Sequence, residues 1–172
     1  MSPEELSTLF KAAREDFEVE NGQPTNAYLV KIRSVITSTL LLAPYDDENG
    51  NHNLVGLVCS TSKYKATHQG NLDFHSPTRP AIYDPNITEN DKPSIVRKKD
   101  ITRKARVNDY KLYTKEKLEA RGLILHAVHK TWVLDLKDKE TLFTQVTPRQ
   151  LLDHLQSICG GLHTINVIAL QN

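Results

Sequence analysis

Apolar residues recur every three or four positions over most of the chain, and this spacing predicts a series of amphipathic helices. The first is predicted over residues 3–20. The second begins at residue 25 or 26 and ends before Pro44, because the residue before a proline disfavours the helical conformation. Residues 35–43 are rich in β-branched side chains, yet their spacing favours a helix. The inward apolar positions of these helices are Leu6, Leu9, Phe10, Ala13, Phe17, Leu29, Ile32, Val35, Ile36 and Leu40.

The middle of the chain is predicted to alternate loops with one helix. Residues 46–53 form a turn-rich loop with Asn49-Gly50 at its tip, and a third helix follows over residues 54–68. Residues 69–92 contain three prolines and few periodic apolar residues, which predicts one long surface loop. The apolar side chains expected to anchor that loop are Ile82, Tyr83 and Ile87.

Two further helices are predicted after the loop. Pro93 suits a first helical position and opens a basic helix that continues to about Lys117. Gly122 is a candidate kink, or a break before the next apolar helical segment, which starts at Leu123 and holds the only tryptophan, Trp132.

The clearest helix start lies near the C-terminal end of the sequence. Thr147 and Gln150 have the spacing of a capping box, with proline between them at the first helical position. Gly160-Gly161 is predicted to end this helix, and a second amphipathic segment follows over residues 165–170. Leu155 is expected to be buried close to Trp132. The apolar face of the helix is Leu151, Leu152, Leu155 and Ile158.

These elements together predict an all-α, single-domain helical bundle over residues 1–172. The pattern contains about six or seven helices and one long proline-containing loop at residues 69–92. Strands do not alternate with helices in the pattern, so a parallel sheet is not expected.

The composition is that of a globular protein, with 38% hydrophobic and 25% charged residues in a chain of 172. The sequence has no apolar run of about 18 residues, and its acidic start lacks the apolar core of a signal peptide. We therefore expect a cytoplasmic protein with no membrane span. Cys59 and Cys159 are expected to be free thiols in a reducing compartment.

The charge is unevenly distributed although the net charge is only +1. Between Lys92 and Arg121 the chain has 11 basic and 4 acidic residues, which gives +7, whereas the remaining 11 basic and 17 acidic residues give −6. Such asymmetry favours an electrostatic partner or head-to-tail contact between copies of the chain.

Several residues have side chains that could bind a metal or act in catalysis, but their spacing favours ordinary structural roles. The acidic run after Tyr45 resembles a calcium loop, but His52 stands where that loop requires glycine, so an acidic turn is expected. A nucleophilic role for Cys159 is disfavoured because it lies near the end of a helix. The chain has no zinc-knuckle spacing, Asp-Thr-Gly triplet or P-loop. We therefore expect no enzyme activity, cofactor, metal or small-molecule substrate. The remaining potential zinc ligands are His126, His129, His154, Cys159 and His163.

Several segments in the same order resemble the Gag polyprotein of copia-type LTR retrotransposons, in particular elements of unicellular algae and other protists. They are Trp132 with its Leu-Asp-Leu continuation, the linker 138–146, residues 146–155, residues 36–56 and residues 79–85. The resemblance covers most of the chain but only the capsid region of such a polyprotein. It implies a capsid-like fold and a structural function in which the domain self-associates into a shell that packages element RNA.

The basic helix is the candidate contact surface, because phosphate contacts require only lysine and arginine on one face. Two partners remain open, RNA and the acidic part of a neighbouring subunit. The alternative outside any retroelement is a helical adaptor or RNA-binding domain that uses residues 93–121. A solvated helix face would explain the same charges without any partner. The candidate contact residues are Arg97, Lys98, Lys99, Arg103, Lys104 and Arg106.

Overall fold

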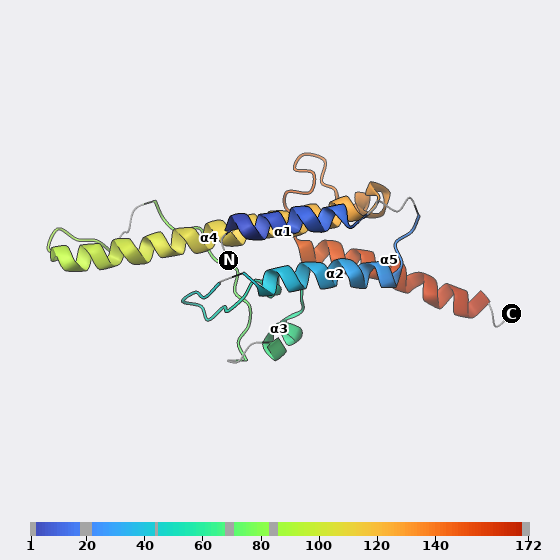
Figure 1. Cartoon of the computed structure of the whole chain (residues 1–172), viewed down its shortest axis with the longest axis horizontal. Coiled ribbons are helices and arrows are strands. Elements are labelled where there is room, and N and C mark those ends of the chain that lie inside the picture. Colours follow the sequence, from blue (N-terminus) through green and yellow to red (C-terminus); the bar gives the residue numbers. More distant parts are fainter. Residues whose placement is uncertain (1–2, 18–21, 44, 68–70, 83–85, 170–172) are drawn as a thin grey trace.

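The computed structural model describes residues 3–17, 22–43, 45–67, 71–82 and 86–169, with side chains from residue 4 to residue 159. It confirms an all-α helical bundle (Figure 1), because the described residues contain no strand beyond an isolated bridge between Asp138 and Leu142. The elements in chain order are α1 (Pro3–Glu15), α2 (Asn26–Leu41), the 3₁₀-helix η1 (Val55–Leu57), α3 (Thr61–Thr67), α4 (Pro93–Ala127), the 3₁₀-helix η2 (Lys130–Leu136) and α5 (Pro148–Ala169).

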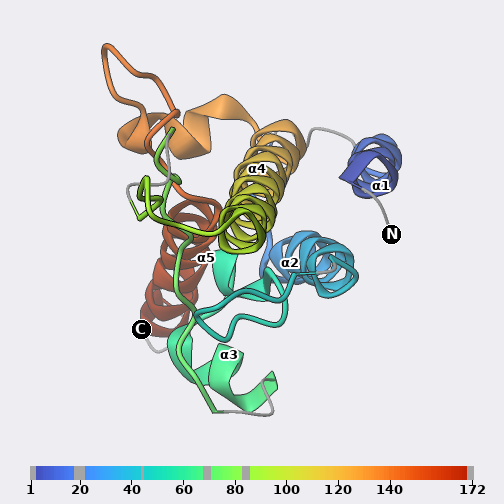
Figure 2. The same cartoon turned by 90° about the vertical axis from the view of Figure 1, so that its left-hand side faces the viewer.

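Helix α4 is the axis of the molecule. Its 35 residues extend about 50 Å at 1.5 Å per residue. Helix α1 packs along its C-terminal half, and α2 and α5 pack beneath that same half (Figure 1). The end-on view places α1 and α5 on different sides of α4, with α2 between them and α3 farther out (Figure 2). One half of α4 is therefore the centre of a bundle, and the other half extends beyond it.

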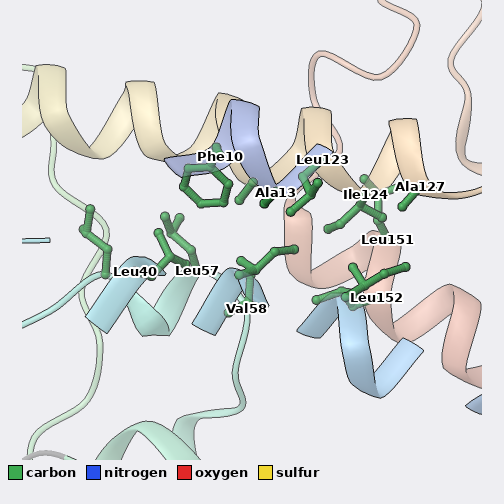
Figure 3. Packing of buried hydrophobic residues seen from close by; sticks show 14 of the residues in the cluster. Phe10, Ala13, Leu40, Leu57, Val58, Leu123, Ile124, Ala127, Leu151 and Leu152 are labelled. Carbon is green, nitrogen blue, oxygen red and sulfur yellow. The ribbon is translucent and has the colours of Figure 1, made fainter. Parts of the chain in front are cut away.

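The core lies where α1, α2, α4 and α5 meet (Figure 3). Phe10 of α1, Leu40 of α2, Leu123 of α4 and Leu151 of α5 are fully buried. Burial of each such side chain contributes about 1.5–3 kcal/mol. The helical spacing located these residues correctly, whereas Leu9 is partly exposed.

The first two helices follow the pattern, with one change in length. Helix α1 ends at Glu15, earlier than expected, and residues 18–21 lie outside the described residues. Helix α2 begins after Thr25, whose hydroxyl accepts a hydrogen bond from the Tyr28 amide at 3.2 Å. Thr25 therefore caps α2 as the sequence predicted.

The third helix was predicted as one element over residues 54–68, and this prediction is wrong. The segment divides into η1 and α3, because Ser60 starts a new helix with its own cap. The Ser60 carbonyl accepts from the Tyr64 amide at 2.9 Å, and its hydroxyl accepts from the Lys63 amide at 3.4 Å. Just before η1, the Asn53 side-chain oxygen accepts from the Val55 amide at 3.1 Å. The competing cap at Ser60 was the signal that the spacing argument missed.

The predicted kink at Gly122 is also wrong, because α4 continues through it to Ala127. The Arg14 side chain of α1 packs against Gly122, so that a Cβ there would lie 2.5 Å from Arg14 Nη2. The segment that holds Trp132 is the 3₁₀-helix η2 rather than an α-helix. Trp132 is half-buried instead of buried, and its indole N–H donates to the Gly22 carbonyl at 3.0 Å.

Helix α5 starts as predicted and ends later than predicted. The Thr147 amide donates to Gln150 Oε1 at 2.8 Å, and the Gln150 amide donates to Thr147 Oγ1 at 3.1 Å. This reciprocal pair is a complete capping box. The backbone remains helical through Gly160-Gly161 to Ala169, without the left-handed glycine that would end it. The side-chain pattern predicted for residues 165–170 lies outside the described residues.

The long loop is anchored by side chains other than those predicted. Ile82 is 77% exposed and Ile87 is 40% exposed, while Tyr83 lies outside the described residues. Phe74 instead packs edge-on against Tyr64, with ring centroids 5.2 Å apart. The His75 amide donates to the Asn51 side chain at 3.0 Å. The loop is therefore held at its beginning, against α3 and the turn before η1.

Candidate interaction surface on the basic helix

The N-terminal half of α4 stands outside the core. Its described residues from Pro93 to Lys111 include no buried side chain, and burial begins at Leu112. Figure 1 shows this half extending past the end of α1. Ile95 and Ile101 on it are exposed. We call residues 93–111 the arm; at 1.5 Å per residue it is about 28 Å long.

One face of the arm turns toward two loop segments. Lys98, Lys99, Thr102 and Arg106 continue the helical face that is buried farther along at Leu112. Together with residues 45–49 and 77–81 they line a groove of about 700 Å³. The stripe that is apolar in the bundle is therefore polar along the arm.

Lys99 and Arg103 are engaged within the chain. Lys99 Nζ pairs with the Asp91 carboxylate at 2.8 Å and also donates to the Asn86 carbonyl. Arg103 Nη1 donates to the Ile82 carbonyl at 2.9 Å. The Lys99 ammonium and the hydrogen bond from the Thr88 amide hold the pKa of the Asp91 carboxyl below its usual value. Both cations therefore attach the end of the long loop to the arm.

Two more of the candidate residues form ion pairs. Lys104 Nζ lies 2.8 Å from the Asp100 carboxylate one turn earlier, and this contact lowers the pKa of Asp100. Arg106 pairs with Glu48 of the turn before η1. Such exposed pairs contribute little to stability. Among the described residues, Arg97 and Lys98 form no ion pair, so the arm retains less free positive charge than its composition suggests.

The part of the groove that residues 45–49 form is acidic. The Asp47 carboxylate accepts hydrogen bonds from the amides of Asn49 and Asn51 at 3.0 and 3.1 Å, which shapes the predicted turn. Burial, then the charges of Asp47 and Asp46, raise the pKa of Asp109. A polyanion that entered this groove would meet carboxylates as well as cations. The groove is therefore poorly suited to nucleic acid, and the outward face of the arm is the better candidate.

Two of the potential metal ligands, His154 and Cys159, make separate contacts, and the side chain of His163 lies outside the described residues. His154 Nε2 lies 3.1 Å from the Trp132 carbonyl oxygen, and the Cys159 thiol donates to the Pro24 carbonyl at 2.7 Å. Within the described ranges, no group of three His, Cys, Asp or Glu side chains could hold a metal ion. Cys59 and Cys159 are free thiols, as expected.

Glu116 is the residue that the sequence argument overlooked. It lies on the buried face of α4 between Tyr113 and Ala120 and has no exposed surface. Neither carboxylate oxygen has a hydrogen-bond partner among the described residues. Burial raises the pKa of Glu116 to about 7, with a smaller opposing effect from Lys115. The sequence did contain a signal for its burial, because Glu116 occupies a position where the helical spacing predicts an apolar residue.

No protein-family model, curated protein or solved structure gives a significant match to this chain. In the part of the chain that the structure describes, no helix is long and apolar enough to cross a membrane.

Proposed function

We propose that this chain is a non-enzymatic structural domain that self-associates, as a Gag-like capsid domain of a copia-type retrotransposon whose shell packages element RNA. The retrotransposon assignment rests on the sequence resemblance. The observation that carries the self-association is the arm, a helical segment of about 28 Å without buried side chains.

Most of the stability of a helix in a protein comes from tertiary packing, so tertiary contacts normally support such a segment. The arm receives such contacts on one face, from the loop segments that line the groove. Its other positions present Ile101, Arg97 and Lys104 to solvent. Contact with a second subunit would bury the isoleucine and place the cations near the acidic remainder of that subunit. Both effects favour association.

The test is the mass of the purified chain over a range of concentrations, measured by sedimentation without RNA. We expect concentration-dependent assembly that added salt weakens, because exposed charges are screened over about 8 Å at physiological ionic strength. Ile101→Ser combined with Arg97→Glu should shift assembly to higher concentration. Val30→Ser, which alters an exposed residue of α2, is the matched control. A chain that stays monomeric at every concentration and salt level contradicts the proposal.

The second candidate is an RNA-binding adaptor that remains a monomer. Arg97 and Lys98 favour it, since neither has an ion-pair partner in the described part of the chain. RNA affinity should then fall with a log–log salt slope of about −0.7 for each phosphate neutralised on a single strand. Arg97→Glu with Lys98→Glu should weaken RNA binding and reduce that slope. An unchanged RNA affinity would exclude the arm as the RNA contact.

A further inference from the structure

A second hollow lies away from the arm, where η1, α3, the middle of α4 and the start of α5 meet. It has a volume of about 230 Å³ and opens to solvent. For comparison, an apolar cavity of about 150 Å³ accommodates benzene. We call it the Cys59 cleft, because the half-buried Cys59 lines it. Its size suits one small group rather than a peptide.

The charged residues that line the cleft are both cations. They are Lys117 of α4 and Arg149 of α5, and no aspartate or glutamate lines it. Arg149 Nε lies 3.5 Å from Asp153, outside the lining, and its guanidinium carries further N–H donors. Lys63 lies near enough to the Cys59 thiol to oppose the rise that burial causes in its pKa. The cleft therefore favours an anion, in contrast to the groove beside the arm.

The neutral part of the lining combines hydroxyl groups with aromatic rings. Thr61, Ser76 and Thr147 supply hydroxyls, and the rings are those of Phe74 and Tyr113. Lys117 Nζ lies 5.8 Å from the centre of the Tyr113 ring, so that cation and ring occupy one side of the cleft. Cations and hydroxyls bind phosphate oxygens, and aromatic rings pack against sugars and bases.

We propose that the Cys59 cleft binds a nucleoside phosphate, with Lys117 and Arg149 contacting the phosphate and Phe74 and Tyr113 packing against the sugar or base. The cleft opens to solvent, so its volume would hold the phosphate and part of the sugar or base while the rest of the nucleotide unit lies outside. That unit can be a free nucleotide or one residue of an RNA strand. If RNA is the source, the inference rests on the RNA part of the proposed function. It does not depend on self-association or on the arm.

The Cys59 thiol supplies a direct reporter. Cys59 lines the cleft, whereas Cys159 is buried, so alkylation by N-ethylmaleimide should modify Cys59 first. We expect millimolar AMP, or a single-stranded uridine octamer, to slow alkylation of Cys59 several-fold in the full chain. Lys117→Glu and Arg149→Glu should each abolish this protection. Lys11→Glu makes the same charge change at an exposed residue of α1 outside the cleft and should leave it intact.

Protection by both ligands identifies a site that accepts free nucleotide, and protection by the octamer alone identifies an RNA site. Absence of protection by either ligand overturns the inference, and so does protection that persists in both reversed variants. Far-ultraviolet circular dichroism checks that each variant is folded, and Lys117→Gln with Arg149→Gln replaces any that is not. Sedimentation of the same samples reports assembly independently. A negative result for nucleotide binding at the cleft can therefore be distinguished from a negative result for self-association.

Discussion

Replacing Glu116 should make the protein more stable above neutral pH. The carboxyl is fully buried on the core face of α4, and its oxygens have no hydrogen-bond partner among the described residues. Among the charged groups around it, Lys115 lowers the pKa of Glu116 and Glu119 raises it. An unpaired buried carboxylate is costly, so the folded protein holds the proton more tightly than the unfolded chain does.

The size of the effect follows from the proton affinity. The pKa of Glu116 rises from an ordinary value of 4.5 to about 7. Between these values the folded state binds more protons than the unfolded state, so the free energy of unfolding falls as pH rises and levels off above about 7. Each tenfold change in proton affinity is worth about 1.4 kcal/mol. The total loss is therefore on the order of 3 kcal/mol.

The assay is urea unfolding at pH 5 and pH 8, followed by circular dichroism. Most of the loss lies in this interval, so wild type should lose about 2–3 kcal/mol relative to Glu116→Met, whose side chain has similar length and no charge. Glu116→Gln should behave similarly in its pH dependence, although its amide also lacks a partner. Glu119→Gln is the matched control. It removes a partly exposed carboxylate that pairs with Arg14 at 3.0 Å, and it should retain most of the wild-type pH dependence.

One result would refute this reasoning. If the stability difference between wild type and Glu116→Met changes by less than about 0.5 kcal/mol from pH 5 to pH 8, the carboxyl is hydrated or paired in solution. The face of α4 around Glu116 would then be more open than its burial indicates.

Two further predictions concern packing. Leu155→Ala should lower the free energy of unfolding by about 2–5 kcal/mol in urea, because Leu155 is fully buried in the bundle. Leu134→Ala, at an exposed site, is the control and should lower it by less than about 0.5 kcal/mol. Equal losses in the two variants would contradict the assignment of Leu155 to the core. Gly56→Ala should destabilise the protein by about 1–3 kcal/mol and speed proteolysis of residues 71–82, since the new Cβ would lie 2.0 Å from Phe74 Cγ. Gly22→Ala, with no neighbour within 4 Å, is its control, and unchanged proteolysis would show that Phe74 does not anchor the loop.

Local signals predicted the helices well where nothing competed with them. Thr25 and the Thr147–Gln150 pair cap their helices as expected, because a cap depends on residues within one turn. One error, at Gly122, coincides with a contact between distant segments. The packing of Arg14 against Gly122 joins α1 to α4, and no spacing rule within α4 contains that information. Gly160 and Gly161 also remain helical although their intrinsic preference opposes it, and no contact of the described residues explains this.

The candidate site was predicted in composition but not in arrangement. The six basic residues do lie on one exposed helix, as their clustering indicated. Their partners could not be read from the sequence, because Lys99 and Arg103 bind backbone carbonyls of residues 13 and 21 positions away. The Cys59 cleft was missed for a similar reason, since Lys117 and Arg149 come from different helices.

These contacts change how the basic segment must be tested. Lys99 and Arg103 hold the arm against the long loop, and Arg106 holds it against the turn before η1. Reversing Arg103, Lys104 and Arg106 together would remove two of these contacts, those of Arg103 and Arg106, and would impair assembly or RNA binding even if none of the three touched a partner. Arg97 lies outside the groove and Lys98 lines it, and neither forms an ion pair among the described residues. Their reversal therefore alters the charge of the arm with little effect on these contacts. A loss of function in the first variant with full function in the second would identify the basic run as support for the arm rather than as the contact itself.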